Sequence, residues 1–125
     1  MSETSPAPFK FKIALCQVSV GKIKTENLEM AKTKIESAVK EHGVKLVMLP
    51  ECFNCPYGNQ FFEEYAEDLP NVGATLEEVS SSPSVKMLCE TAEKLKIYIV
   101  GGSIPERSSE NGQNRIFNTS IVVSP

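Results

Sequence analysis

One acidic residue in this sequence stands where it could transfer protons. Glu51 follows an apolar run, Val44 to Leu49, and the proline at position 50. Such a run is typical of a buried strand, so we expect a rigidly placed and partly buried carboxylate. A carboxylate in that setting suits a general base. The alternative is a structural glutamate that caps a helix or pairs with a surface lysine, and position alone leaves both open.

Two cysteines beside this glutamate suggest a second kind of chemistry. Cys52 and Cys55 form a Cys-x-x-Cys pair, a spacing that occurs in zinc and redox sites. Zinc needs four ligands, however, and the sequence has no second such pair and only one histidine, His42. A redox pair normally opens a helix, whereas residues 56–58, Pro-Tyr-Gly, predict a turn. The pattern therefore favours neither a metal site nor redox chemistry.

The composition limits the classes of partner. The chain has 125 residues, of which 41% are hydrophobic and 23% charged, as in an ordinary globular domain or a piece of one. Its net charge is −3 and no basic cluster contains interleaved aromatic residues, so we expect neither nucleic acid nor a membrane as partner. Residues 1–9 predict a short disordered lead, with Glu3 where a signal peptide would be basic. We therefore expect a cytoplasmic protein.

The elements that must position Glu51 alternate between strands and helices. Strands are predicted from apolar runs at residues 11–18, 44–49, 97–100 and 117–123. Residues 103–115 are polar and turn-rich, so we expect a loop there. Helices are predicted from apolar residues at helical spacing, at residues 28–39 and 83–95. Thr25 or Asn27 could cap the first helix and Gly43 could end it, while Ser82 and Pro83 suit the start of the second.

This alternation predicts an α/β fold with a parallel core and both helices on one face of the sheet. Residues 51–82 form a long connection, and connections of that length are often functional. Gln17, Ser19 and the Gly-Gly-Ser sequence at 101–103 should share the carboxyl edge of the sheet with Glu51. We expect the two glycines to serve close backbone packing there rather than to cradle a phosphate.

Residues 49–58, together with shorter blocks before and after them, resemble the nitrilase superfamily of carbon–nitrogen hydrolases, and most closely its omega-amidase branch. Residues 49–58 contain Leu-Pro-Glu-Cys-Phe-Asn at 49–54 and Pro-Tyr-Gly at 56–58. Further blocks occur at residues 14–17, 63–70, 99–106 and 117–120. The blocks come in the right order, so the resemblance covers nearly the whole chain after residue 10.

The resemblance implies a fold and a catalytic residue. The fold would be part of an αββα sandwich, with residues 10–125 as the N-terminal part of the hydrolase domain. The family uses a Glu–Lys–Cys triad and no cofactor, and only its glutamate matches this chain, at Glu51. The lysine and cysteine are expected beyond Pro125. Tyr57 and Phe53 could line the substrate pocket, although core packing is the more common role of such aromatic residues.

The resemblance also implies a reaction. An omega-amidase releases ammonia from small monoamides of dicarboxylic acids, of the alpha-ketoglutaramate and succinamate type, and the family commonly forms homodimers. One alternative is the neighbouring branch, which deamidates deaminated glutathione. Another is a non-catalytic fragment or short isoform. A mitochondrial location is an alternative to the cytoplasm.

Overall fold

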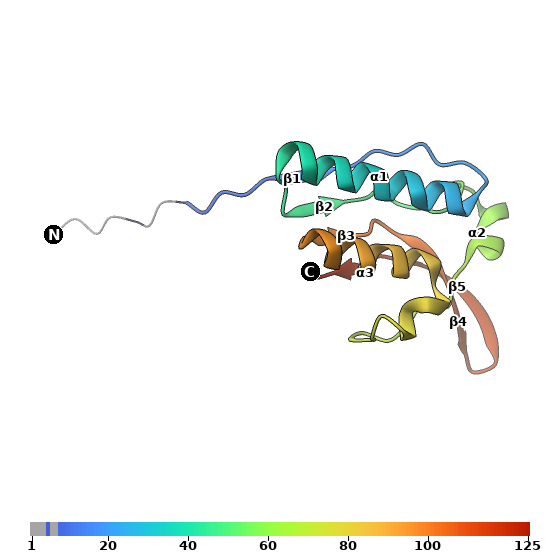
Figure 1. The fold of residues 1–125 in the computed structure, drawn as a ribbon. Coiled ribbons are helices and arrows are strands. Elements are labelled where there is room, and N and C mark those ends of the chain that lie inside the picture. The colour runs from blue at the N-terminus through green and yellow to red at the C-terminus, as the bar shows by residue number, and fades with distance from the viewer. Residues whose placement is uncertain (1–4, 6–7) are drawn as a thin grey trace.

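The computed structural model of the protein describes Ser5 and residues 8–125 (Figure 1). Most of the predicted disordered lead, residues 1–9, lies outside the described residues. The described part forms, in chain order, β1 (Ile13–Leu15), α1 (Lys24–His42), β2 (Leu46–Met48), α2 (Asn59–Tyr65), the 3-10 helix η1 (Glu78–Ser81), α3 (Pro83–Leu95), β3 (Tyr98–Val100), β4 (Ile104–Glu110), β5 (Gln113–Thr119) and β6 (Val122–Val123).

Four of these strands form one sheet in the order β1-β2-β3-β6. β1, β2 and β3 are parallel, and the central register sets Val47 opposite Ile99. β6 runs antiparallel to β3, while β4 and β5 form a separate antiparallel hairpin. The predicted α/β fold with a parallel core is confirmed.

Both long helices cover the same face of this sheet. α1 and α3 lie side by side along it (Figure 1) and contact each other. Ile35 of α1 and Leu88 of α3 are fully buried against Val47 and Ile99 of the central strands. The strand order does not reverse, so right-handed crossovers bring both helices to one side, as the sequence predicts.

Of the three helix ends predicted from capping residues, two are correct. Gly43 ends α1 in the left-handed conformation and donates its N–H to the Val39 oxygen. Ser82 and Pro83 begin α3, with the Ser82 hydroxyl accepting from the Val85 N–H. The cap predicted for α1 is wrong: the helix begins after Ile23, which makes no side-chain cap.

Asn27, one of the two residues predicted to cap α1, is used differently. It lies inside α1, is buried, and exchanges two hydrogen bonds of 2.8 Å with the backbone of Gly21. This side chain therefore ties the preceding loop to the helix, which begins without a polar cap.

The C-terminal part differs from the sequence prediction. The polar stretch 103–115 was expected to be a loop, but it provides β4 and the start of β5. The expected strand 117–123 is divided into the end of β5 and the short β6. Asn111 and Gly112 both have positive φ, as a tight hairpin turn requires. Backbone hydrogen bonds between β4 and β5 stabilise this polar segment as a hairpin. A strand can therefore form here without the apolar alternation on which the prediction relied.

The sheet face opposite the helices is exposed. Ile13, Leu15, Tyr98 and Val122 are 49%, 70%, 53% and 66% exposed. This exposure follows from the predicted placement of both helices on one face, because among the described residues one helical layer covers one face only. Among the described residues, no helix is long and apolar enough to cross a membrane.

The exposed sheet face leads to a prediction about the self-association of a polypeptide that consists of residues 1–125 alone. We expect it to self-associate, because an uncovered apolar sheet face drives association in water. Leu15→Glu should increase the monomer fraction in analytical ultracentrifugation. Met30→Glu is the matched control, since Met30 is 38% exposed on α1, within the helical layer. A parent chain that stays monomeric at all concentrations would contradict this expectation.

Candidate active site

A small pocket lies where the chain leaves β2. Its volume is about 200 Å³, and its walls come from the turn after β2, from α2 and from the β4–β5 hairpin. Apolar side chains make up most of the lining, with one carboxylate and one amide among them. The lining residues are Glu51, Cys52, Tyr57, Phe62, Pro105, Ile116, Phe117 and Asn118.

Glu51 is the carboxylate of this pocket. The Asn118 side-chain amide donates a hydrogen bond of 2.6 Å to Glu51 Oε1. The residue is exposed, so the expected partial burial is wrong for the described structure. The reason is that Glu51 begins a turn after the strand. The pocket residues Tyr57 and Phe117 do not cover it, because they are themselves exposed.

The backbone on either side of Glu51 is closely packed. Gly102 has a φ of +52°, and a Cβ added there would lie 1.9 Å from the Pro50 carbonyl oxygen. Only a glycine fits such an approach. The neighbouring Ser103 hydroxyl accepts a 3.2 Å hydrogen bond from the Cys52 N–H. The predicted close packing of the glycines beside Glu51 is therefore confirmed.

The other residues expected at this edge separate into two groups. Tyr57 is 75% exposed, lines the pocket and meets Phe62 edge to face, with ring centroids 6.2 Å apart. Phe53 is fully buried in the main core and does not line the pocket, so the structure assigns it the packing role. Gln17 lines a separate depression beside β1 and the end of α1. Ser19 is likewise not among the pocket residues.

Sequence reasoning gave no role to the hairpin residues of the pocket. Ile116, Phe117 and Asn118 all belong to β5, and Pro105 belongs to β4. Part of the signal was present, because residues 117–120 form one of the blocks of the resemblance. This block did not predict a pocket wall, because the segment before it was expected to be a loop and not the strand that pairs with it.

Burial disfavours the thiolate form of the two cysteines that follow Glu51. Burial raises the pKa of the Cys52 thiol, although this residue touches the pocket. Burial, together with the neighbouring Cys52, raises the pKa of Cys55 to about 12. Reactive cysteines need the thiolate form, so neither thiol is activated here. Among the described residues, no group of three or more histidine, cysteine or acidic side chains is arranged for a metal ion.

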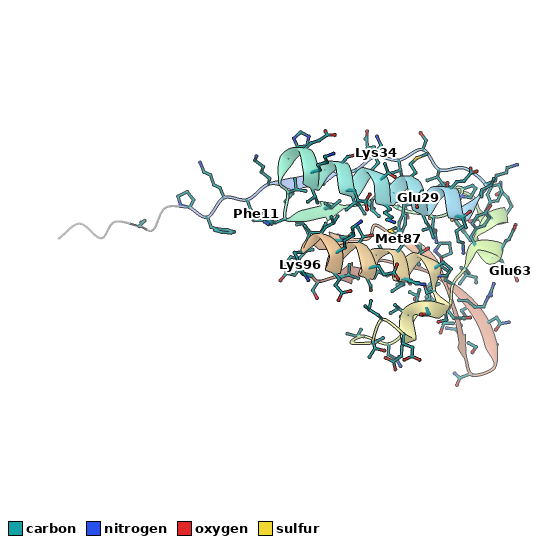
Figure 2. All side chains as sticks on the ribbon, in the orientation of Figure 1. Phe11, Glu29, Lys34, Glu63, Met87 and Lys96 are labelled. Atoms are coloured by element: carbon teal, nitrogen blue, oxygen red, sulfur yellow. The ribbon has the colours of Figure 1, made fainter. Side chains whose placement is uncertain are left out.

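The two lysines nearest to β3 in the sequence lie away from the pocket. Lys94 pairs with Glu36 of α1 at 3.3 Å, on an exposed surface. Figure 2 shows Lys96 at the end of α3 that points away from the β4–β5 hairpin, and hence from the pocket walls that it provides. Both are therefore exposed residues at the end of α3, away from the pocket.

A buried polar cluster holds the loop that follows Glu51. Asn54 donates from its side-chain amide to Glu67 Oε2 at 3.1 Å and to the Ser84 hydroxyl at 2.9 Å. Glu67 also accepts from the Ser82 hydroxyl at 2.6 Å and the Ser84 N–H at 2.9 Å. Lys24 of α1 pairs with the same carboxylate at 3.3 Å. The cluster thus joins α1, the loop that follows Glu51 and the start of α3.

The charge of Glu67 suits this position. Burial raises the pKa of its carboxyl group, but the hydrogen bonds from Ser82 and Ser84 and the Lys24 charge outweigh it, so the pKa is lowered overall. An anion is also favoured at the start of a helix. Glu67 is therefore ionised in the folded protein and links three segments through one carboxylate.

Comparison with known proteins places this chain in a family. Residues 12–125 match the family model for carbon-nitrogen hydrolases. The chain belongs to the carbon-nitrogen hydrolase family. Omega-amidase NIT2 of Danio rerio is 46% identical over 116 residues, which cover 93% of this chain and 36% of the relative. The chloroplastic omega-amidase of Arabidopsis thaliana is 46% identical over 94% of this chain and 29% of its own length.

A solved structure shares the fold of this family member. Nit3 of Saccharomyces cerevisiae, from branch 10 of the nitrilase superfamily, matches with a TM-score of 0.68 and 42% identity. The match covers 83% of this chain and 35% of that one. The expected membership of the nitrilase superfamily is confirmed. The chain spans about a third of the length of the relatives that it matches.

The buried cluster predicts a pH-dependent loss of stability. In the complete gene product that carries residues 1–125, we expect Glu67→Gln to lower the free energy of unfolding by about 1–3 kcal/mol at pH 7, because charged hydrogen bonds are lost. The folded-state pKa of Glu67 is lowered, so its contribution is present above the ordinary carboxyl pKa and is lost as the pH falls through the folded value.

Urea unfolding at pH 7 and in acid measures this difference. The difference in free energy of unfolding between the parent and Glu67→Gln should become smaller as the pH falls. Asp68→Asn is the matched control, because Asp68 is the adjacent acidic residue and is exposed. An equal effect of the two variants, or a gap that does not change with pH, would show that the Glu67 carboxylate is not the stabilising group.

Proposed function

We propose that Glu51 is the general base of an omega-amidase-like hydrolase that acts on small monoamides of dicarboxylic acids. One observation carries the proposal. The glutamate of the family signature stands at a small pocket, with its carboxylate hydrogen-bonded to Asn118 at 2.6 Å. The similarity to omega-amidases of fish and plant origin supports this choice of substrate class.

The proposed reaction has two halves. Glu51 first takes the proton of the family's catalytic cysteine, whose thiolate attacks the amide carbonyl carbon. The family's lysine stabilises the negative oxygen of the tetrahedral intermediate. Glu51 then gives the proton to the leaving nitrogen, so ammonia departs and a thioester remains. In the second half Glu51 takes a proton from water, which attacks the thioester. Glu51 then returns this proton to the departing thiolate, so the carboxylic acid is released and both the thiol and the base are restored.

The pocket supports a small substrate. A volume of about 200 Å³ with Phe62, Ile116 and Phe117 in its walls suits a short methylene chain next to the reacting amide. Succinamate and alpha-ketoglutaramate meet this description. Deaminated glutathione, the substrate of the alternative branch, is much longer and serves as the comparison substrate. The homodimer and the cytoplasmic location stay predictions.

The base is tested by Glu51→Gln in the complete gene product that carries residues 1–125. We expect kcat for ammonia release from succinamate to fall by about 10²–10⁴-fold, since glutamine cannot accept the proton. Glu63→Gln is the matched control, because Glu63 is an exposed acidic residue of α2 that does not line the pocket (Figure 2). A Glu51→Gln enzyme with parental kcat would refute the proposed base.

A second test asks whether residues 1–125 contain only the glutamate of the proposed triad, and it uses this polypeptide alone. No residue of the chain matches the family's lysine or cysteine, so we expect no ammonia release above the uncatalysed rate. The assay incubates this polypeptide with succinamate and detects ammonia. Turnover that Glu51→Gln abolishes would show that residues 1–125 contain a complete catalytic set, and the triad assignment would then be wrong.

A further inference from the structure

An amide side chain of the β4–β5 hairpin contacts the carboxylate of Glu51. Asn118 Nδ2 donates to Glu51 Oε1 over 2.6 Å, although the two residues are 67 positions apart. Both line the same pocket. An N–H donor to a carboxylate makes a short, charge-assisted hydrogen bond, which is stronger than a neutral one. The contact therefore constrains the side chain of Glu51.

The backbone around Asn118 is itself fixed from two sides. Within the hairpin, Asn118 stands opposite Pro105 in the antiparallel register. Just beyond it the chain crosses to the main sheet, where the Ile121 carbonyl oxygen accepts a 2.7 Å hydrogen bond from the Gly101 N–H. Asn118 is thus held between the hairpin and the sheet edge at which Glu51 leaves β2. It is placed to orient Glu51 and not merely to touch it.

The hydrogen bond from Asn118 gives the two carboxylate oxygens of Glu51 different roles. An asparagine N–H donates and cannot take up a proton, so Oε1 is occupied by a partner that does not compete for the reacting proton. Oε2 is left to exchange protons with the nucleophile and the leaving group. Glu51 is exposed, and an exposed glutamate without a partner has several side-chain rotamers available. One directional bond selects among these rotamers.

We propose that Asn118 is the positioning residue of the general base and keeps Glu51 Oε2 directed at the reacting atoms. This inference rests on the proposed function, in which Glu51 moves the proton. Asn118 acts through Glu51 and does not itself transfer a proton. A purely structural hydrogen bond between two exposed groups would instead support the hairpin and leave the catalytic step unchanged.

Kinetics of Asn118 variants separate these two roles. In the complete gene product that carries residues 1–125, we expect Asn118→Ala to lower kcat for succinamate by about 100-fold, as for a misplaced catalytic group, with KM nearly unchanged. Asn118→Asp keeps the size but replaces the donor with a second negative charge, so its kcat should fall at least as far. Asn114→Ala is the matched control, because Asn114 is exposed on the same strand and does not line the pocket.

A double-mutant cycle shows whether Asn118 acts through Glu51. In a Glu51→Gln background, Asn118→Ala should cause no further loss of kcat, because the group that it orients is already inactive. Thermal unfolding of each variant accompanies the kinetics. Parental melting temperatures together with the lowered kcat would exclude a loss of folding as the cause and support the positioning role.

The outcomes distinguish this inference from the proposed function. If Glu51→Gln retains parental kcat, the proposed function fails, and the positioning role fails with it. If Glu51→Gln loses turnover while Asn118→Ala and Asn118→Asp retain parental kcat, only the positioning role is overturned. It is also overturned if the losses from Glu51→Gln and Asn118→Ala multiply, because the two residues would then act independently.

Discussion

The pairing of β2 with β3, and the close contact just beyond it, is the constraint on which the site depends. Leu49 donates its N–H to the Val100 carbonyl oxygen, which extends the parallel ladder by one residue beyond β2. The two backbone segments that follow β2 and β3 then stay so close that no side chain fits at Gly102, opposite the Pro50 carbonyl. Glu51 follows directly, so its position is set by backbone contacts on both neighbouring segments. Such rigid placement suits the general base that we propose Glu51 to be.

Two further sets of contacts extend this constraint to the rest of the chain. The Glu67 cluster ties the loop after Glu51 to α1 and to the start of α3 through buried, charge-assisted hydrogen bonds. The β4–β5 hairpin supplies the opposite wall of the pocket and the amide that meets Glu51. The pocket is thus made from two parts of the chain that are distant in sequence, residues 51–62 and 105–118, and each is held by its own contacts.

The predictions that succeeded relied on periodicity and on local backbone chemistry. Alternation of apolar runs with helical spacing indicated the parallel sheet and both long helices, and Gly43 and Pro83 marked helix ends because glycine and proline have strong intrinsic preferences. The prediction failed for residues 103–115, since a polar hairpin is satisfied by its backbone ladder and needs no apolar alternation. It also failed for the burial of Glu51, which depends on what packs above the strand end.

The sequence by itself determined the class of fold and the family to which the chain is similar, and it singled out Glu51 as the candidate base. These follow from local patterns and from an ordered set of short blocks, which the printed residues contain in full. Only the tertiary structure decided which side chains share the pocket with Glu51. Tyr57 enters it and Phe53 does not, although the two are four positions apart, because the turn between them directs one ring to the surface and the other into the core. Asn118 likewise meets Glu51 only through the crossing of the hairpin, a contact between distant positions that no local pattern encodes.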